Sequence, residues 1–66
     1  MIKKVNLKVY HKGELVRDIR PNLKNSIIFD AKTELGIKQI IEQFFQGNEV
    51  NEDKEYRIIS AKFKND

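Results

Sequence analysis

Lysines and tyrosines at two-residue spacing carry the most suggestive chemistry in this chain. In the segment KVNLKVYHK, basic and aromatic residues occupy positions that an extended strand turns to one face. Ammonium groups that contact phosphates, and rings that stack on bases, are what single-stranded nucleic-acid binding requires. A later segment, EYRIISAKF, adds two such residues. The predicted basic–aromatic face consists of Lys4, Lys8, Tyr10, Lys12, Tyr56 and Lys62.

The same pattern has an ordinary structural explanation. One face of an antiparallel sheet is commonly exposed to water, and lysine and tyrosine are frequent there. The sequence contains no RRM-type aromatic motif, no GxxG loop of a KH domain and no basic helix. Nucleic-acid binding through this face is therefore the alternative function, ranked behind protein contact.

Catalysis and metal binding find little support. The acidic segment NEVNEDKE lacks the alternating ligands, central glycine and terminal glutamate of a calcium loop. The single histidine, His11, lies beside a turn glycine without a neighbour that marks it as a base or ligand, and there is no cysteine. The three glycines are scattered and form no phosphate-binding loop. We expect no enzyme activity, no cofactor and no metal site.

The clearest element of the scaffold is a helix over residues 34–46. Thr33 is its candidate N-cap, with Asp30 as the competitor. Gly47 follows the last periodic residue, where a left-handed residue ends many helices. Gly36 lowers the helix propensity of the first turn. The apolar stripe recurs at i, i+3, i+4 and i+7 and consists of Ile37, Ile40, Ile41 and Phe44, with Phe45 at its rim.

Strands must supply the layer that covers this stripe. Alternating residues before His11 predict a first strand, and His11-Lys12-Gly13 is typical of a three-residue hairpin loop. A two-residue loop at Lys12-Gly13 would place Leu7 opposite Asp18, so we favour the longer loop.

Pro21 ends the second strand, because proline cannot donate to a sheet. Residues 26–30 (SIIFD) predict a third strand, unless one bent strand runs from Leu15 to Phe29. Residues 48–54 are a polar acidic loop, and residues 56–63 predict the last strand. On that strand, alternation leaves two sets, and we expect Ile59, Ala61 and Phe63 to face the helix and Tyr56, Ile58, Ser60 and Lys62 to face outward.

The predicted fold is α+β: a small antiparallel-rich sheet with one helix packed on one face. The element order is β-β-β-α-β, or β-β-α-β if the second and third strands are continuous. We expect a meander, the helix and a final strand within one domain spanning residues 1–66. The predicted core consists of Val5, Leu7, Val9, Leu15, Ile19, Phe29, Ile37, Ile40, Ile41, Phe44, Ala61 and Phe63.

Length, hydropathy and charge indicate how stable the chain is, where it is located and how its charge is distributed. A chain of 66 residues buries only about 60% of its unfolded surface, so its stability is marginal. No apolar run approaches the ~20 residues that cross a bilayer, and we expect a cytoplasmic location. The net charge is +3 and the pI about 9.3. Residues 1–26 carry seven basic and two acidic side chains, whereas residues 27–53 carry two basic and six acidic ones, so the charge is polarised.

Three apolar residues fit neither the stripe nor the expected core. Leu35, Phe45 and Ile58 would lie at or near the surface and form a candidate interface. Such a patch is most simply satisfied by a symmetric homodimer. An exposed edge strand offers the same outcome by strand addition.

The segments IIFDAKTELGIKQII and EYRIISAKF, together with the enrichment in Lys, Asn and Ile, give the chain a family likeness. It resembles short accessory proteins encoded by phages and mobile elements of AT-rich Gram-positive bacteria. This likeness rests on element order and composition. It implies no catalytic residues, and it implies a stand-alone protein that binds and modulates a host component such as a defence or transcription enzyme. We therefore expect a non-enzymatic binding protein that contacts a host protein, or a second copy, through a sheet face or edge.

Overall fold

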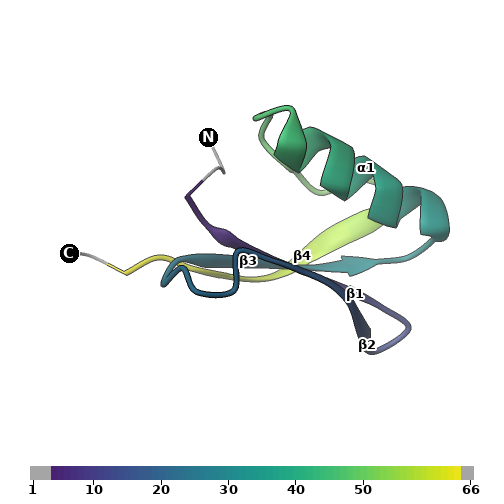
Figure 1. The fold of residues 1–66 in the computed structure, drawn as a ribbon. Helices are drawn as coiled ribbons and strands as arrows, with labels where there is room; N and C mark the ends of the chain where they lie inside the picture. Colours follow the sequence, from purple (N-terminus) through teal and green to yellow (C-terminus); the bar gives the residue numbers. More distant parts are fainter. Residues whose placement is uncertain (1–3, 65–66) are drawn as a thin grey trace.

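Four strands and one helix form two layers in the computed structural model, which describes residues 4–64 (Figure 1). The helix crosses one face of the sheet and leaves the other face open (Figure 1). The α+β class and the order β-β-β-α-β are confirmed, with the second and third strands separate. The elements are β1 (Asn6–His11), β2 (Glu14–Ile19), β3 (Ser26–Ala31), α1 (Glu34–Phe45) and β4 (Tyr56–Lys62).

The strand order is β2-β1-β3-β4, so the predicted meander is wrong. β1 pairs with β3 in parallel, and the two outer pairs are antiparallel. Residues 20–25 carry the chain from one side of β1 to the other. Arg20 turns the backbone with a φ of 58°, and the Asn6 amide donates to the Asn25 carbonyl at 2.7 Å. The first strand is therefore central, and β4 lies at an edge beside β3.

The β1–β2 hairpin has a shorter turn than the sequence predicts. Lys12 and Gly13 have φ values of 53° and 81°, the left-handed pair of a type I′ turn. Tyr10 lies opposite Leu15, and Val16 is then the extra residue of a β-bulge. Because the bulge shifts the register by one residue, Leu7 lies opposite Ile19 and not opposite Asp18. The predicted three-residue loop is wrong, because a two-residue turn followed by a bulge also avoids the pairing of Leu7 with Asp18.

A second bulge decides the orientation of β4. Tyr56 lies opposite Ala31 and Ile58 opposite Phe29, so both face the helix, and Ile59 is the extra residue. The predicted assignment of faces is therefore wrong for the first half of this strand. Beyond the bulge, Ala61 lies opposite Ile27 as expected, but it is exposed.

Both helix caps lie where the sequence predicts them. At the start, the Thr33 hydroxyl oxygen accepts a hydrogen bond from the Gly36 amide at 3.1 Å. At the end, Gly47 has a φ of 78° and donates to the Phe44 carbonyl at 3.1 Å. The Asn48 amide donates to the Gln43 carbonyl at 2.9 Å, which completes a Schellman motif.

Gly36 is required for a reason that helix propensity does not reveal. It is buried where α1 approaches the segment before β4, and a Cβ built on it would overlap the Glu55 carbonyl oxygen. The same carbonyl accepts from the Lys32 amide at 2.8 Å. The Thr33 hydroxyl donates to Glu55 Oε2 at 2.6 Å. The helix start is thus fastened to the chain entering β4.

The core lies between α1 and the strands beneath it. Val50, from the acidic loop, and Tyr56 are buried members that the sequence analysis missed. The Tyr56 ring meets Phe29 edge-to-face, with ring centroids 5.7 Å apart. Leu15 and Phe63, placed in the core by the sequence analysis, are exposed by 44% and 65%. The buried apolar residues are Val5, Leu7, Val9, Ile27, Phe29, Ala31, Ile40, Phe44, Val50 and Tyr56, and Val16, Ile19, Ile37 and Ile58 pack against them.

Candidate functional site

The side of the sheet opposite α1, here the outer face, carries no second layer within the described residues (Figure 1). Alternation along β1 turns Lys8 and Tyr10 to this face, since Leu7 and Val9 are buried under the helix. The registers place neighbours from the other strands beside them. The outer face consists of Asn6, Lys8, Tyr10, Leu15, Asp18, Ser26, Ile28, Asp30, Arg57, Ser60 and Lys62.

Two ion pairs cross this face between neighbouring strands. Lys8 Nζ lies 3.3 Å from Asp18 Oδ2, and Arg57 Nε lies 3.2 Å from Asp30 Oδ2. These acids come from β2 and β3, strands that contribute no residue to the predicted basic–aromatic face. The outer face is therefore of mixed charge and not a uniformly basic stripe.

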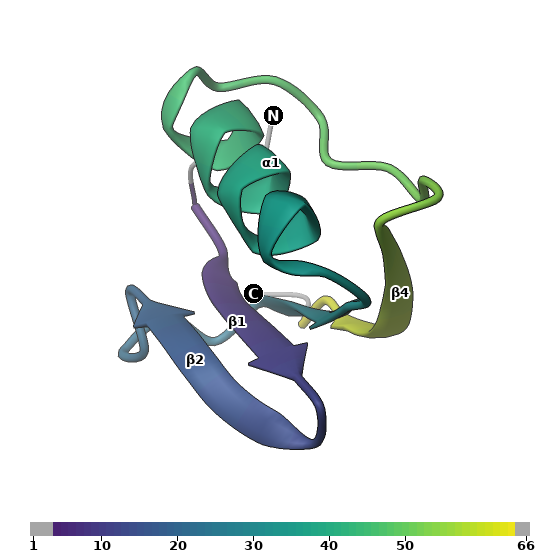
Figure 2. The same ribbon diagram turned by 90° about the vertical axis from the view of Figure 1, so that its right-hand side faces the viewer.

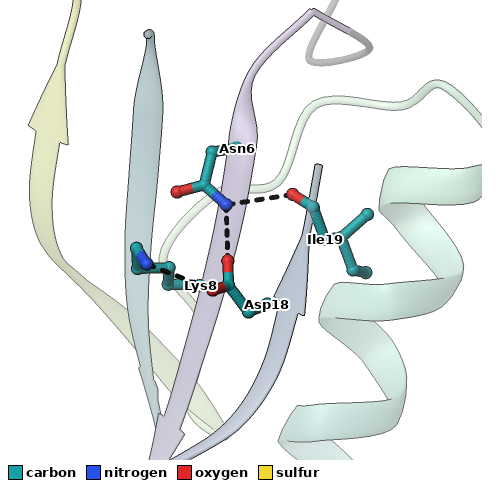
Figure 3. Close-up of polar contacts among 4 residues, drawn as sticks. All are labelled: Asn6, Lys8, Asp18 and Ile19. Carbon is teal, nitrogen blue, oxygen red and sulfur yellow. Dashed lines mark hydrogen bonds and ion pairs between the residues drawn. The ribbon is translucent and has the colours of Figure 1, made fainter. Parts of the chain in front are cut away.

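Asn6 organises the end of the outer face next to β2 (Figure 3). It is only 3% exposed, and its Nδ2 group donates to Asp18 Oδ1 at 2.7 Å and to the Ile19 carbonyl at 3.0 Å. The hydrogen bond from Asn6 holds the pKa of Asp18 below its ordinary value, and the hydrogen bond and charge of Lys8 act in the same direction against the opposing effect of burial. Asp18 is thus held as a carboxylate between an amide and an ammonium group.

Three apolar side chains lie beside the two ion pairs on this face. Tyr10 is half-buried and lies opposite Leu15, which is 44% exposed. Ile28 is half-buried on β3, and the parallel register places it beside Lys8. An aromatic ring and two aliphatic side chains framed by charge pairs are typical of a protein contact surface.

The structure brings only part of the predicted basic–aromatic face together. Lys8 and Tyr10 are central, and Lys62 lies near the end of β4 on the same side. Lys4 lies ahead of β1, and Lys12 lies in the hairpin turn, both exposed.

Tyr56 does not belong to the outer face. It is 2% exposed beneath α1, and its hydroxyl donates to Gln43 Oε1 at 3.1 Å. Burial, and after it the nearby Asp53 charge, raise the pKa of Tyr56 above its ordinary value, while the Gln43 hydrogen bond opposes them. The correction follows from the bulge at Ile59, which simple alternation along the strand does not reveal.

The predicted interface residues also separate. Leu35 and Phe45 are exposed by 54% and 65% on α1, as expected. Ile58 is half-buried against the core and faces the helix, so it is not part of a surface patch. The sequence analysis placed Ile59 and Phe63 inside, but they are exposed by 49% and 65%.

Both edge strands are poorly suited to strand addition. β2 and β4 each carry a bulge, and bulges interrupt the regular row of edge donors and acceptors. On β4, the Ile58 amide donates to Glu52 Oε1 at 3.3 Å, and the Tyr56 carbonyl accepts from the Asp53 amide at 3.1 Å. On β2, Arg17 Nη1 donates to the Val16 carbonyl at 3.0 Å. Side chains and the acidic loop thus occupy backbone groups that an added strand would need.

His11 has a structural partner. Its Nδ1 lies 2.8 Å from the Ala31 carbonyl oxygen, and because a carbonyl only accepts, Nδ1–H is the donor. Within residues 4–64, no group of three or more His, Cys, Asp or Glu side chains is arranged to hold a metal ion. In the same part of the chain, no helix is both long enough and apolar enough to cross a membrane.

Comparison with protein-family models, with curated proteins and with solved structures finds no match for this chain. The resemblance to phage accessory proteins stays a prediction, and the function has to be inferred from the surfaces themselves.

Proposed function

We propose that this chain is a non-enzymatic binding protein that recognises a partner protein through its outer face. The observation that supports this most directly is the uncovered sheet face, which carries Tyr10, Leu15 and Ile28 among charged groups. Protein interfaces combine apolar and aromatic side chains with charged groups. The pairs Lys8–Asp18 and Asp30–Arg57 provide those charged groups.

A protein partner suits this face better than a nucleic acid does. Phosphate binding uses cations that are free to replace counterions. Lys8 and Arg57 each face a carboxylate within 3.3 Å, so a phosphate would compete with Asp18 or Asp30. Nucleic-acid binding stays the alternative, and it would depend on the exposed lysines at the margins, Lys4, Lys12 and Lys62.

The face suits a partner better than the sheet edges do. Strand addition needs a regular row of unpaired backbone groups. The bulges at Val16 and Ile59, and the Glu52 carboxylate on the Ile58 amide, interrupt both rows. The proposal therefore favours side-chain recognition over backbone pairing.

The biological setting is part of the proposal. The resemblance to accessory proteins of phages and mobile elements supports a cytoplasmic modulator of a host enzyme. A small domain with one open sheet face can occupy a surface of such an enzyme without chemistry of its own.

The test compares three baits: the wild type, a variant that loses two side chains from the outer face, and a control that loses an exposed apolar side chain elsewhere. Wild type, a Tyr10→Ser/Leu15→Ser variant and a Phe63→Ser control are immobilised and exposed to nuclease-treated host lysate. Phe63 lies outside the outer face and is 65% exposed, which makes it a matched control. A protein retained by wild type and control, but lost from the outer-face variant, is then purified and titrated directly by calorimetry.

The direct titration decides between the two candidates. We expect saturable binding to the purified partner, weakened about tenfold or more by the double substitution, with modest dependence on salt. Equal binding by all three baits would contradict the proposal. An oligonucleotide shift that falls steeply with salt and is lost in Lys12→Glu/Lys62→Glu would establish the alternative.

A further inference from the structure

The helix layer is too narrow for the sheet beneath it. Within residues 4–64, α1 lies against β1, β3 and β4 but not against β2, which projects beyond the helix (Figure 2). A helix with its side chains is about 10–12 Å across, whereas four strands at about 4.8 Å spacing need more than one helix to cover them. A strip of the helix-facing side is consequently left open along β2.

Apolar side chains line this strip from two directions. Val16 and Ile19 of β2 are half-buried against the core, and Figure 3 shows the Ile19 side chain on the helix side of the sheet. On α1, Ile37, Ile41 and Phe45 recur every four residues and form one row. We name these five residues the ledge.

The row on α1 faces β2 for two reasons. Gln43, on the opposite flank of the helix, accepts the Tyr56 hydroxyl bond and so faces β4. Phe44, the neighbour of Phe45, also lies toward β2, because the guanidinium carbon of Arg20, the residue after β2, is 5.3 Å from its ring centroid. Ile37 and Ile41 are half-buried, whereas Phe45, at the C-terminal end of α1, is 65% exposed with its ring against Phe44. Phe45 is therefore a projecting aromatic group at the margin of an apolar ledge.

Charge along the ledge is of both signs, from different elements. Arg17 and Arg20 are exposed on the β2 side. Glu34 and Glu42 are exposed on α1, with the exposed Lys38 between them. A partner surface that carries an exposed aromatic residue and acidic side chains would complement the ledge and the neighbouring Arg17 and Arg20. The α1 surface of a second copy of this chain has these features.

We infer that a second copy of this chain occupies the ledge in a two-fold symmetric contact. Phe45 of each copy packs on Val16 and Ile19 of the other, and Glu42 of each copy lies beside Arg17 of the other. A two-fold axis makes each contact twice, so one projecting ring and one ledge per chain are sufficient. The interface lies on the side of the sheet opposite the outer face, so the dimer does not depend on the proposed function and leaves that face open.

Sedimentation equilibrium over a range of chain concentrations tests the dimer directly. We expect wild type to shift reversibly from monomer to dimer. Phe45→Glu should raise the dimer dissociation constant by about tenfold or more, because aromatic anchors carry much of the energy of an interface. Phe63→Glu is the matched control, since Phe63 is exposed to the same extent, 65%, at the opposite edge of the sheet. The control should dimerise like wild type.

Charge reversal provides an independent test. Arg17→Glu and Glu42→Arg should each weaken the dimer several-fold, and the double variant should recover most of the loss. A purely structural effect of either substitution would not be rescued by the other. Circular dichroism and thermal unfolding confirm that each variant is folded, and Phe45→Ala replaces Phe45→Glu if the latter is not.

Three results would overturn the inference. The first is a wild-type chain that stays monomeric at every concentration. The second is a dimer that Phe63→Glu disrupts as strongly as Phe45→Glu does. The third is a dimer whose formation leaves the methyl resonances of Val16, Ile19 and Ile41 unshifted in NMR spectra.

Discussion

At the scale of single residues, Asn6 shows how a buried amide fixes a charged neighbour. It is almost fully buried, and its Nδ2 group donates two hydrogen bonds to β2, one to Asp18 and one to the Ile19 carbonyl. A buried amide that loses such partners costs about 1–3 kcal/mol. Asn6 therefore holds the end of the edge strand β2 against the central strand β1.

The state of Asp18 makes stability depend on pH. Because folding lowers the pKa of Asp18, its contribution is complete above the unfolded value near 3.8 and is lost as the pH falls through the lower folded value. We expect Asp18→Asn to be less stable than wild type at neutral pH, and the difference in unfolding free energy to vanish in strong acid. Urea unfolding at several pH values measures it.

A matched pair of variants assigns the cause. Asn6→Ala and Lys8→Ala should each raise the Asp18 pKa toward 3.8, because the Asn6 hydrogen bond and the hydrogen bond and charge of Lys8 all lower it. NMR titration of the Asp18 carboxyl carbon follows both variants. A variant that leaves the Asp18 pKa unchanged would contradict the role assigned to the substituted residue.

Gly36 is a second residue whose role depends on its surroundings. In an exposed helix, Gly→Ala is stabilising by about 1 kcal/mol. Here the added methyl group would overlap the Glu55 carbonyl, so we expect Gly36→Ala to be destabilising by about 1–3 kcal/mol, as overpacking is elsewhere. Chemical denaturation checks the sign, with Lys38→Ala on the exposed side of α1 as the control. A stabilised Gly36→Ala variant would show that the contact with Glu55 is not close.

At the scale of elements, the helix and β4 are joined at their first residues. Thr33 Oγ1 accepts from the Gly36 amide and donates to Glu55, so one hydroxyl serves the N-cap and the contact with the neighbouring chain. The end of β3, the helix start and the start of β4 meet at this point. Loss of the Thr33 hydroxyl would remove both hydrogen bonds and weaken the attachment of the N-terminal end of α1 to the start of β4.

Removing that hydroxyl is a direct test. Thr33→Ala should be destabilising by about 1–2 kcal/mol, the range measured for N-caps. Thr33→Ser keeps both hydrogen bonds and should lose much less. A double-mutant cycle with Glu55→Ala isolates the side-chain bond, and a coupling energy of zero would mean that only the cap matters.

Elements were predictable from the sequence where local patterns determine them. The helix, with its caps at Thr33 and Gly47, follows from periodicity and capping chemistry alone. The two bulges do not, because an extra residue leaves alternation looking regular while it reverses the faces beyond it. For this reason Leu15, Tyr56 and Ile58 were assigned to the wrong face.

The candidate site was only partly predictable. Lys8 and Tyr10 lie on the outer face because the pattern of β1 is unbroken. The acids that pair with the basic groups are nonlocal, since Asp30 meets Arg57 across 27 positions in sequence. Nothing in the sequence of residues 20–25 indicates that the chain crosses to the other side of β1, so the strand order could not be predicted from the sequence.

At the scale of the whole molecule, Tyr56 reports whether the helix layer seals the sheet. It lies beneath α1, and burial raises its pKa above the ordinary value of 10.0. The unfolded chain therefore ionises this phenol first, and stability should fall as the pH rises beyond about 10. In Tyr10→Phe, where Tyr56 is the remaining tyrosine, ultraviolet absorbance should show a single titration above pH 10.0.

The converse outcome is equally informative. A Tyr56 that titrates at its ordinary value would place the ring in water and contradict the orientation of β4. Tyr56→Phe is the companion variant, because it keeps the ring against Phe29 and removes only the hydroxyl that reaches Gln43. It should unfold at nearly the wild-type urea concentration and lose the steep alkaline decline.

The central place of β1 has a consequence for assembly during translation. Residues 6–11 leave the ribosome before the strands that flank them, and β1 needs β2 on one side and β3 on the other. The hairpin can form at once, but the parallel flank must wait for twenty more residues, since Asn6 pairs with Ser26. One edge of β3 in turn stays unpaired until β4 emerges. A nascent chain stalled after α1 would thus expose this edge of β3, and the pairing of residues 56–62 is the step that closes the sheet.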